Sequence, residues 1–138
     1  MPLFCGRKDY GVQSFVLKLV NNHCSDVDAL RDGPRLEGRV NLTLVVLVVP
    51  IERGKPRPEK TFTALTKEFA TSGISLVLVE PKAPDEVLLG FYWEGGLKYV
   101  RGKAKHLSPM GGGFYQLGVQ LSQMVHVSDW PGLEKLSF

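Results

Sequence analysis

The longest apolar run of the chain extends from Gly38 to Val49 and stops before Pro50. Valine, leucine and threonine dominate this run, and such side chains fit the pleated surface of a β-sheet. The run is far shorter than the ~20 residues that a helix needs to span a bilayer. It therefore predicts a long, well-buried β-strand that ends at Pro50.

Turn signals divide the following residues into further short segments with high β propensity. Prolines, a glycine and several charges crowd Glu52 to Lys60, and the triplet Gly111 to Gly113 follows later, so both segments predict hairpin loops. Five further strands are expected: Thr61 to Phe69, Ile74 to Val79, Glu86 to Trp93, Leu97 to His106 and Phe114 to Leu121. Six strands at a spacing of about ten residues, with no helical pattern between them, indicate an antiparallel barrel or sandwich.

The two ends of the chain have a different character. Gly11 to Val20 fits either a strand or a helix, whereas Asp26 to Arg31 follows a capping serine and predicts a short helix. A second short helix is expected to begin near Pro131, with Trp130 packing this tail onto the barrel. The chain is accordingly divided into a flanking segment, residues 1–34, a β-domain, residues 35–125, and a tail, residues 126–138.

The composition is that of an ordinary globular domain. Of 138 residues, 43% are hydrophobic and 22% are charged, which suits a single domain with its own core. The net charge of +3 is too small to indicate a nucleic-acid partner. Cys5 and Cys24 lack metal-ligand spacing, and no signal peptide is visible. We therefore expect a cytoplasmic protein with free thiols and no membrane insertion.

Two arginines, Arg35 and Arg39, stand one helical turn apart just before the long apolar run. A guanidinium group is a permanently charged plane that binds phosphate in a bidentate manner and matches the O6/N7 edge of guanine. Two such groups held close together suit a compact ligand that carries both guanine and phosphate. The same spacing also occurs between ordinary surface charges.

The order of these features resembles the PilZ domain, the bacterial module that senses cyclic di-GMP. That family carries an RxxxR motif before its first strand, which Arg35 and Arg39 match, and a later DxSxxG motif, at which Glu68 to Gly73 falls. Val100 to Ala104 and Phe114 to Leu121 resemble its last two strands. The resemblance extends from about Arg35 to Gln123. It implies an all-β, six-stranded antiparallel PilZ-like β-barrel with short flanking helices.

The resemblance also implies a ligand and a set of ligand-binding residues. Cyclic di-GMP would be bound by Arg35, Arg39, Glu68, Ala70 and Gly73. The chain departs from the second motif, because Glu68 replaces the aspartate and Ala70 replaces the serine. The loss of one hydrogen-bonding partner at a buried site costs about 1–3 kcal/mol. Thr71 or Ser72 could supply the missing hydroxyl, and Gly73 would also serve the turn into the next strand.

Other residues offer alternative sites. Arg101, Lys103 and Lys105 share one face of a predicted strand, which is either a solvated surface or a basic strip for nucleic acid or an anionic ligand. The aromatic pairs Tyr92–Trp93 and Phe114–Tyr115 could stack on bases or fill the core. The histidines have no metal-ligand spacing, and no catalytic arrangement can be assembled from the sequence, so neither a metal site nor an enzyme is expected.

These observations favour a signalling receptor or adaptor domain. Binding of cyclic di-GMP would order the arginine segment, change the conformation of the domain and regulate a protein partner of unknown identity, with residues 1–34 as the relay. The main alternative is a degenerate PilZ-like interaction module that does not bind the nucleotide. An oligonucleotide-binding barrel is a weaker alternative, since the modest charge makes nucleic acid an unlikely partner.

Overall fold

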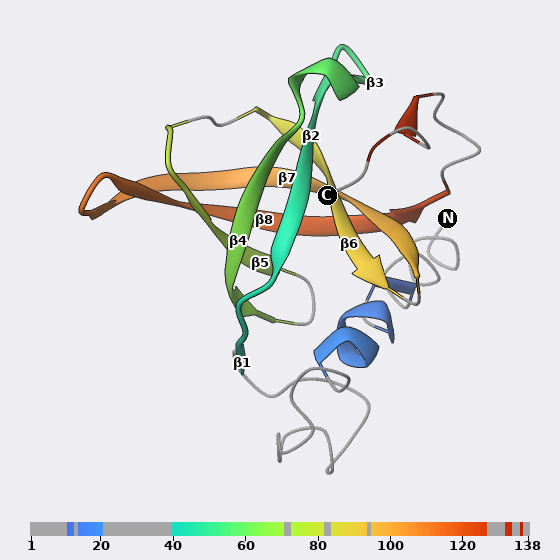
Figure 1. The fold of residues 1–138 in the computed structure, drawn as a ribbon, viewed down its shortest axis with the longest axis horizontal. Coiled ribbons are helices and arrows are strands. Elements are labelled where there is room, and N and C mark those ends of the chain that lie inside the picture. The colour runs from blue at the N-terminus through green and yellow to red at the C-terminus, as the bar shows by residue number, and fades with distance from the viewer. Residues whose placement is uncertain are drawn as a thin grey trace.

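The computed structural model describes residues 11–12, 14–20, 40–70, 73–81, 84–93, 95–126, 132–133 and 136. Strands dominate this part of the chain, together with one N-terminal α-helix formed by residues 11–12 and 14–20 (Figure 1). The remaining elements are β1 (Val40–Asn41), β2 (Val45–Glu52), β3 (Lys55–Pro56), the 3₁₀-helix η2 (Pro58–Lys60), β4 (Phe62–Phe69), β5 (Gly73–Leu78), β6 (Glu86–Trp93), β7 (Gly96–Gly111) and β8 (Phe114–Val125).

All strands belong to one antiparallel sheet that closes on itself. The strand order is β1-β4-β5-β8-β7-β6-β2-β3, and an additional pairing joins β2 to β4, from Val45 opposite Leu65 to Val48 opposite Phe62. This pairing closes β2, β4, β5, β8, β7 and β6 into a ring of six strands. The all-β, six-stranded antiparallel fold that the sequence predicted is therefore confirmed.

The strand expected to stop at Pro50 instead continues through it, so that prediction was wrong. Residues 42–44 leave the ladder, and β2 then extends from Val45 to Glu52, with Pro50 opposite Val87 of β6. The carbonyl of Pro50 accepts a hydrogen bond of 2.8 Å from the Arg57 amide. The backbone polar groups of Pro50 thus face away from β6, and its missing N–H removes no bond from the β2–β6 ladder.

Both predicted hairpin loops are confirmed, but the second joins strands longer than expected. Gly111, Gly112 and Gly113 all have positive φ, at 91°, 64° and 84°, which suits the tight turn between β7 and β8. The pairing of β7 with β6 ends at Lys103. Beyond this residue β7 pairs with β8 alone, and the two strands form an arm that projects past the ring (Figure 1).

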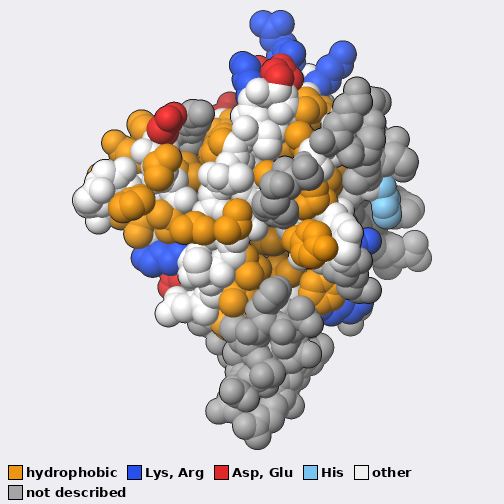
Figure 2. All heavy atoms as spheres, in the orientation of Figure 1, with side chains coloured by type: hydrophobic (Ala, Val, Ile, Leu, Met, Phe, Trp, Pro, Cys, Tyr) orange, Lys and Arg blue, Asp and Glu red, His pale blue; other side chains and the backbone are white. Residues whose placement is uncertain are grey.

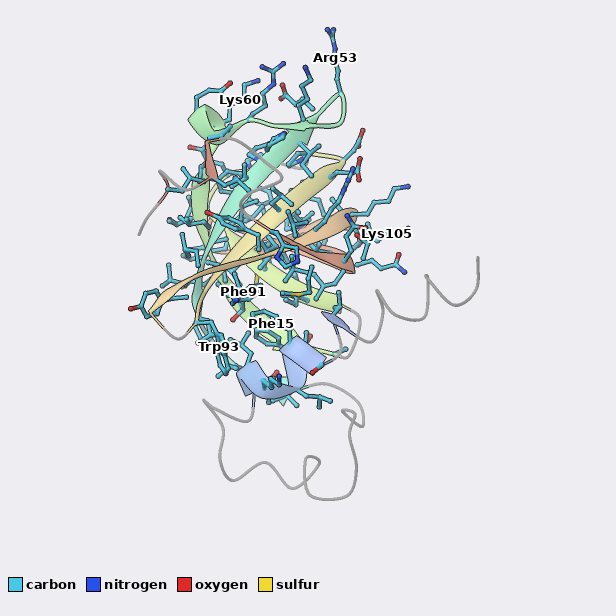
Figure 3. All side chains as sticks on the ribbon, turned by 90° about the vertical axis from the view of Figure 1, so that its right-hand side faces the viewer. Phe15, Arg53, Lys60, Phe91, Trp93 and Lys105 are labelled. Atoms are coloured by element: carbon cyan, nitrogen blue, oxygen red, sulfur yellow. The ribbon has the colours of Figure 1, made fainter. Side chains whose placement is uncertain are left out.

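The N-terminal helix packs against one end of the ring and completes its inner core. Its buried residues follow helical spacing: Val12, Phe15, Val16, Leu19 and Val20. The ring of Phe15 lies 5.6 Å from that of Phe91 and 6.1 Å from that of Trp93, centroid to centroid (Figure 3). The helical alternative for Gly11 to Val20 is therefore the correct one. The helix expected at Asp26 to Arg31 lies outside the described residues.

A second apolar cluster lies on the outer face of β2, β6 and β7. Its buried members are Val49, Ile51, Leu88, Tyr99, Val125 and Leu133. Leu133 and the partly buried Leu136 belong to the C-terminal tail and cover part of this face, while Trp130 lies outside the described residues. Burial on both faces explains why β2 and β6 are apolar along almost their whole length instead of alternating.

Because of Tyr99, the contribution of this second cluster to stability is expected to fall at alkaline pH. Its hydroxyl donates a 3.4 Å hydrogen bond to the carbonyl of Leu133, and burial raises the pKa of Tyr99 above its ordinary value. Because the folded state favours the neutral phenol, this contribution to stability is complete below about pH 10 and is lost as the pH rises through the folded-state pKa. Urea unfolding of the wild type and Tyr99→Phe across this range should show a stability difference that shrinks with rising pH. Parallel pH profiles would contradict this expectation.

Candidate ligand-binding site

A surface pocket of about 350 Å³ lies where β4 ends and β5 begins, beside β7 and β8. Glu68, Ala70 and Gly73 all line this β4–β5 pocket. The structure therefore brings together the three described residues that the sequence assigned to the ligand. Arg35 and Arg39 lie outside the described residues, as do Thr71 and Ser72.

The turn between β4 and β5 fixes the edge of the pocket. The Ala70 amide donates a 2.9 Å hydrogen bond to the Gly73 carbonyl, and Phe69 pairs with Ile74 directly before and after it. Gly73 has no positive φ, so the turn itself does not require glycine. A Cβ atom at Gly73 would lie 3.4 Å from the carbonyl oxygen of Val119, at the near limit of an ordinary van der Waals contact, so β8 passes close to this position without excluding a side chain.

The strand that follows the arginine motif pairs with two residues of the same pocket. In β1, Val40 pairs with Phe69 and Asn41 with Glu68, and both partners line the pocket. Arg39 is bonded directly to Val40 in the sequence. The first motif is thus covalently attached to a strand that pairs with the residues of the second motif.

A buried threonine holds the segment between β1 and β2 in place. Thr66 is 1% exposed; its hydroxyl donates to the Leu42 carbonyl at 2.5 Å and accepts from the Leu44 amide at 2.7 Å. The sequence analysis missed this role. One signal for it was present in the sequence: Thr66 lies two residues after the buried Ala64, so its hydroxyl occupies an inward position of the strand.

Two β-bulges lie next to the pocket, one at Lys67 in β4 and one at Lys105 in β7. The pairing register shifts between Thr66 and Glu68, and again between Ala104 and His106. Such bulges re-aim side chains and are common beside binding sites. Lys105 lines the pocket, whereas Lys67 donates a 3.2 Å hydrogen bond to the side chain of Gln116.

The three basic residues of β7 have different environments. Arg101 is 24% exposed in its side chain and forms an ion pair of 2.9 Å with Glu86, so it serves the β6–β7 pairing. Lys103 is exposed and does not line the pocket. Only Lys105 of the predicted strip reaches the candidate site.

The exposed aromatic residues do not form one stacking surface. Tyr92 is 62% exposed and Phe114 is 46% exposed, whereas Trp93 and Tyr115 pack against the core. Tyr92 pairs with Leu97 and Phe114 with Gly111, which are at opposite ends of β7. This arrangement does not favour the oligonucleotide-binding alternative.

Comparison with known proteins finds similarity at the level of solved structures. No family model matches the chain, and no curated protein matches it. The chain is similar to the inhibitor of motility (MotI/DgrA) of Bacillus subtilis, with 13% identity and a TM-score of 0.47. The match covers 65% of this chain and 43% of that one, so it spans less than half of the other protein. Among the described helices, none has the length and apolar character needed to cross a membrane.

Proposed function

We propose that this chain is a PilZ-like, non-catalytic receptor domain of the cytoplasm that binds cyclic di-GMP and regulates a protein partner. One observation carries the proposal. The pairing of Val40 with Phe69 joins the strand after the arginine motif to the wall of a pocket that Glu68, Ala70 and Gly73 line. This pairing supports the expectation that the segment carrying the arginine motif approaches the residues of the second motif.

The chemistry of the ligand suits these residues. Cyclic di-GMP carries two phosphodiester charges and two guanines, which Arg35 and Arg39 would bind through bidentate and stacking contacts. The carboxylate of Glu68 would accept hydrogen bonds from guanine N–H groups. Ala70 offers no hydroxyl, which is expected to weaken binding by about 1–3 kcal/mol, or about tenfold to hundredfold.

A chain of aromatic contacts supports the N-terminal helix as the relay. Phe69 lines the pocket, its ring lies 6.3 Å from that of Phe91, and Phe91 contacts Phe15 of the helix at 5.6 Å. A ligand that shifts Phe69 would thereby alter the surface on which the helix rests. The partner would then distinguish the two states by the position of the helix.

The direct test is titration calorimetry with cyclic di-GMP on the wild type and on Arg35→Ala. The loss of one guanidinium is expected to weaken binding about tenfold to hundredfold. Arg53→Asn is a suitable control, because it removes an arginine from the β2–β3 turn, where φ is 54° and asparagine is tolerated. Arg53 does not line the pocket and lies at the far end of the molecule from the helix (Figure 3).

The second candidate function is a protein-interaction module that no longer binds the nucleotide. Besides Ala70, an exposed apolar pair favours it: Val45 and Leu65 are directly opposite each other on β2 and β4 and are 51% and 43% exposed. Hydrophobic side chains gather across this face of the molecule (Figure 2). If the wild type binds no cyclic di-GMP at high ligand concentration, the interaction module is the better account.

A further inference from the structure

We infer that Lys105 is a third cation of the proposed site and that its ammonium group binds a phosphate of the dinucleotide. The inference rests on the proposed function and extends it to a residue outside both sequence motifs. Among the described residues that line the β4–β5 pocket, Lys105 is the only cation and Glu68 the only anion.

The backbone places Lys105 at the pocket through an irregularity in the sheet. Ala104 pairs with Val119 and His106 with Gly118, so Lys105 is the extra residue of a bulge. Ala104 and Leu107, three residues apart, both pack against the core, whereas regular alternation would turn Leu107 outward. The bulge therefore leaves Lys105 and His106 both on the exposed side.

Two glycines on nearby strands line the pocket together with this lysine. These are Gly73, from β5, and Gly118, from β8. Their strands are paired, with Gly73 opposite Gln120 and Ser75 opposite Gly118. The pocket of about 350 Å³ that these residues line lies beside the β4–β5 turn and the bulge, and it is large enough for a phosphate group.

The ammonium group of Lys105 is available to a ligand. Within the described part of the chain, no hydrogen bond or ion pair engages it, in contrast to the pairing of Arg101 with Glu86 at 2.9 Å and of Lys67 with Gln116 at 3.2 Å. A lysine is a compact point charge that donates to phosphate without a planar partner. A phosphodiester of the bound ligand is therefore the group it fits, while guanine recognition remains with the arginines and Glu68.

The test compares Lys105→Met with Lys103→Met by calorimetry with cyclic di-GMP at low and at physiological salt. Both variants remove one positive charge from the exposed side of the same strand, but only Lys105 lines the pocket. Lys105→Met is expected to weaken binding about tenfold at low salt and to show a smaller salt dependence than the wild type. At physiological salt Lys103→Met should bind within about twofold of the wild type, since exposed charges outside a site are largely screened there. Lys105→Arg, which keeps the charge, should restore most of the affinity.

The possible results separate the inference from the function on which it rests. Wild-type affinity and salt dependence in Lys105→Met would overturn the inference alone, as would equal weakening in both methionine variants. A wild type that binds no cyclic di-GMP would overturn the proposed function and the inference with it. Lys105 makes no described interaction that stabilises the fold, so the wild type and Lys105→Met should have equal melting temperatures. Equal values would show that the loss of affinity comes from the lost contact with the ligand. A lower melting temperature for Lys105→Met would count against that conclusion.

Discussion

Replacing Phe91 with alanine is expected to lower the free energy of unfolding by about 3–5 kcal/mol. Phe91 is 1% exposed and lies inside the ring on β6. Its ring contacts Phe69 at 6.3 Å and Phe15 at 5.6 Å, so its removal opens a cavity between the sheet and the N-terminal helix. Neither neighbour can fill this space without leaving its own packed position.

The neighbouring residue provides a matched control for Phe91. Tyr92 belongs to the same strand but is 62% exposed, so Tyr92→Ala should change stability by no more than about 0.5 kcal/mol. Guanidinium unfolding of both variants and the wild type measures the difference. A loss below about 1.5 kcal/mol in Phe91→Ala would show that the core collapses into the space, contrary to a tightly packed ring. Hydrogen exchange in Phe91→Leu would test whether the helix amides lose protection first.

Thr66→Val is expected to cost at least about 2 kcal/mol although it preserves shape, because it leaves two backbone groups without a partner at about 1–3 kcal/mol each. The hydroxyl of Thr66 bridges the Leu42 carbonyl and the Leu44 amide. Two further bonds join the same segments, from the Leu42 amide to the Lys67 carbonyl and from the Thr66 amide to the Leu44 carbonyl. Without the hydroxyl, these two backbone bonds and the packing of Leu42 and Leu44 against the core would still hold the entry into β2.

Two further variants isolate the contribution of the hydroxyl. Thr63→Val makes the same chemical change at an exposed position of β4, where it should be nearly neutral. Thr66→Ser retains the hydroxyl and should lose only the smaller effect of one buried methyl group, about 1 kcal/mol. If Thr66→Ser proves as unstable as Thr66→Val in thermal unfolding, the methyl packing and not the hydrogen bonds stabilises this segment.

The sequence predicted the strands well because their signals are local. Runs of β-branched residues and the glycine triplet before Phe114 mark strands and turns without knowledge of their neighbours. The helix at residues 11–20 was also present in the pattern, since Val12, Phe15 and Leu19 recur at helical spacing. Pro50 misled the prediction because its effect depends on which side of the strand its backbone faces, and only the sheet pairing decides that.

The candidate site was predictable to the extent that it is built from neighbouring residues. Glu68, Ala70 and Gly73 belong to one hairpin, that of β4 and β5, and therefore lie together in any fold that keeps it. Lys105 reaches the same pocket only through the register of β7, β8 and β5, and through a bulge. An inserted residue in a strand carries no reliable mark in the amino-acid pattern. The strict alternation expected of a strand therefore could not reveal that Leu107 packs against the core.

The tail residue Leu133 gives the molecule two unequal flanks. The outer surface of β2 and β6 is already packed beneath the tail, whereas the outer side of β4 carries an exposed leucine at position 65. The protein partner proposed above would therefore find exposed apolar surface beside β4, where the described residues leave Leu65 uncovered, and not over the buried residues of β2 and β6.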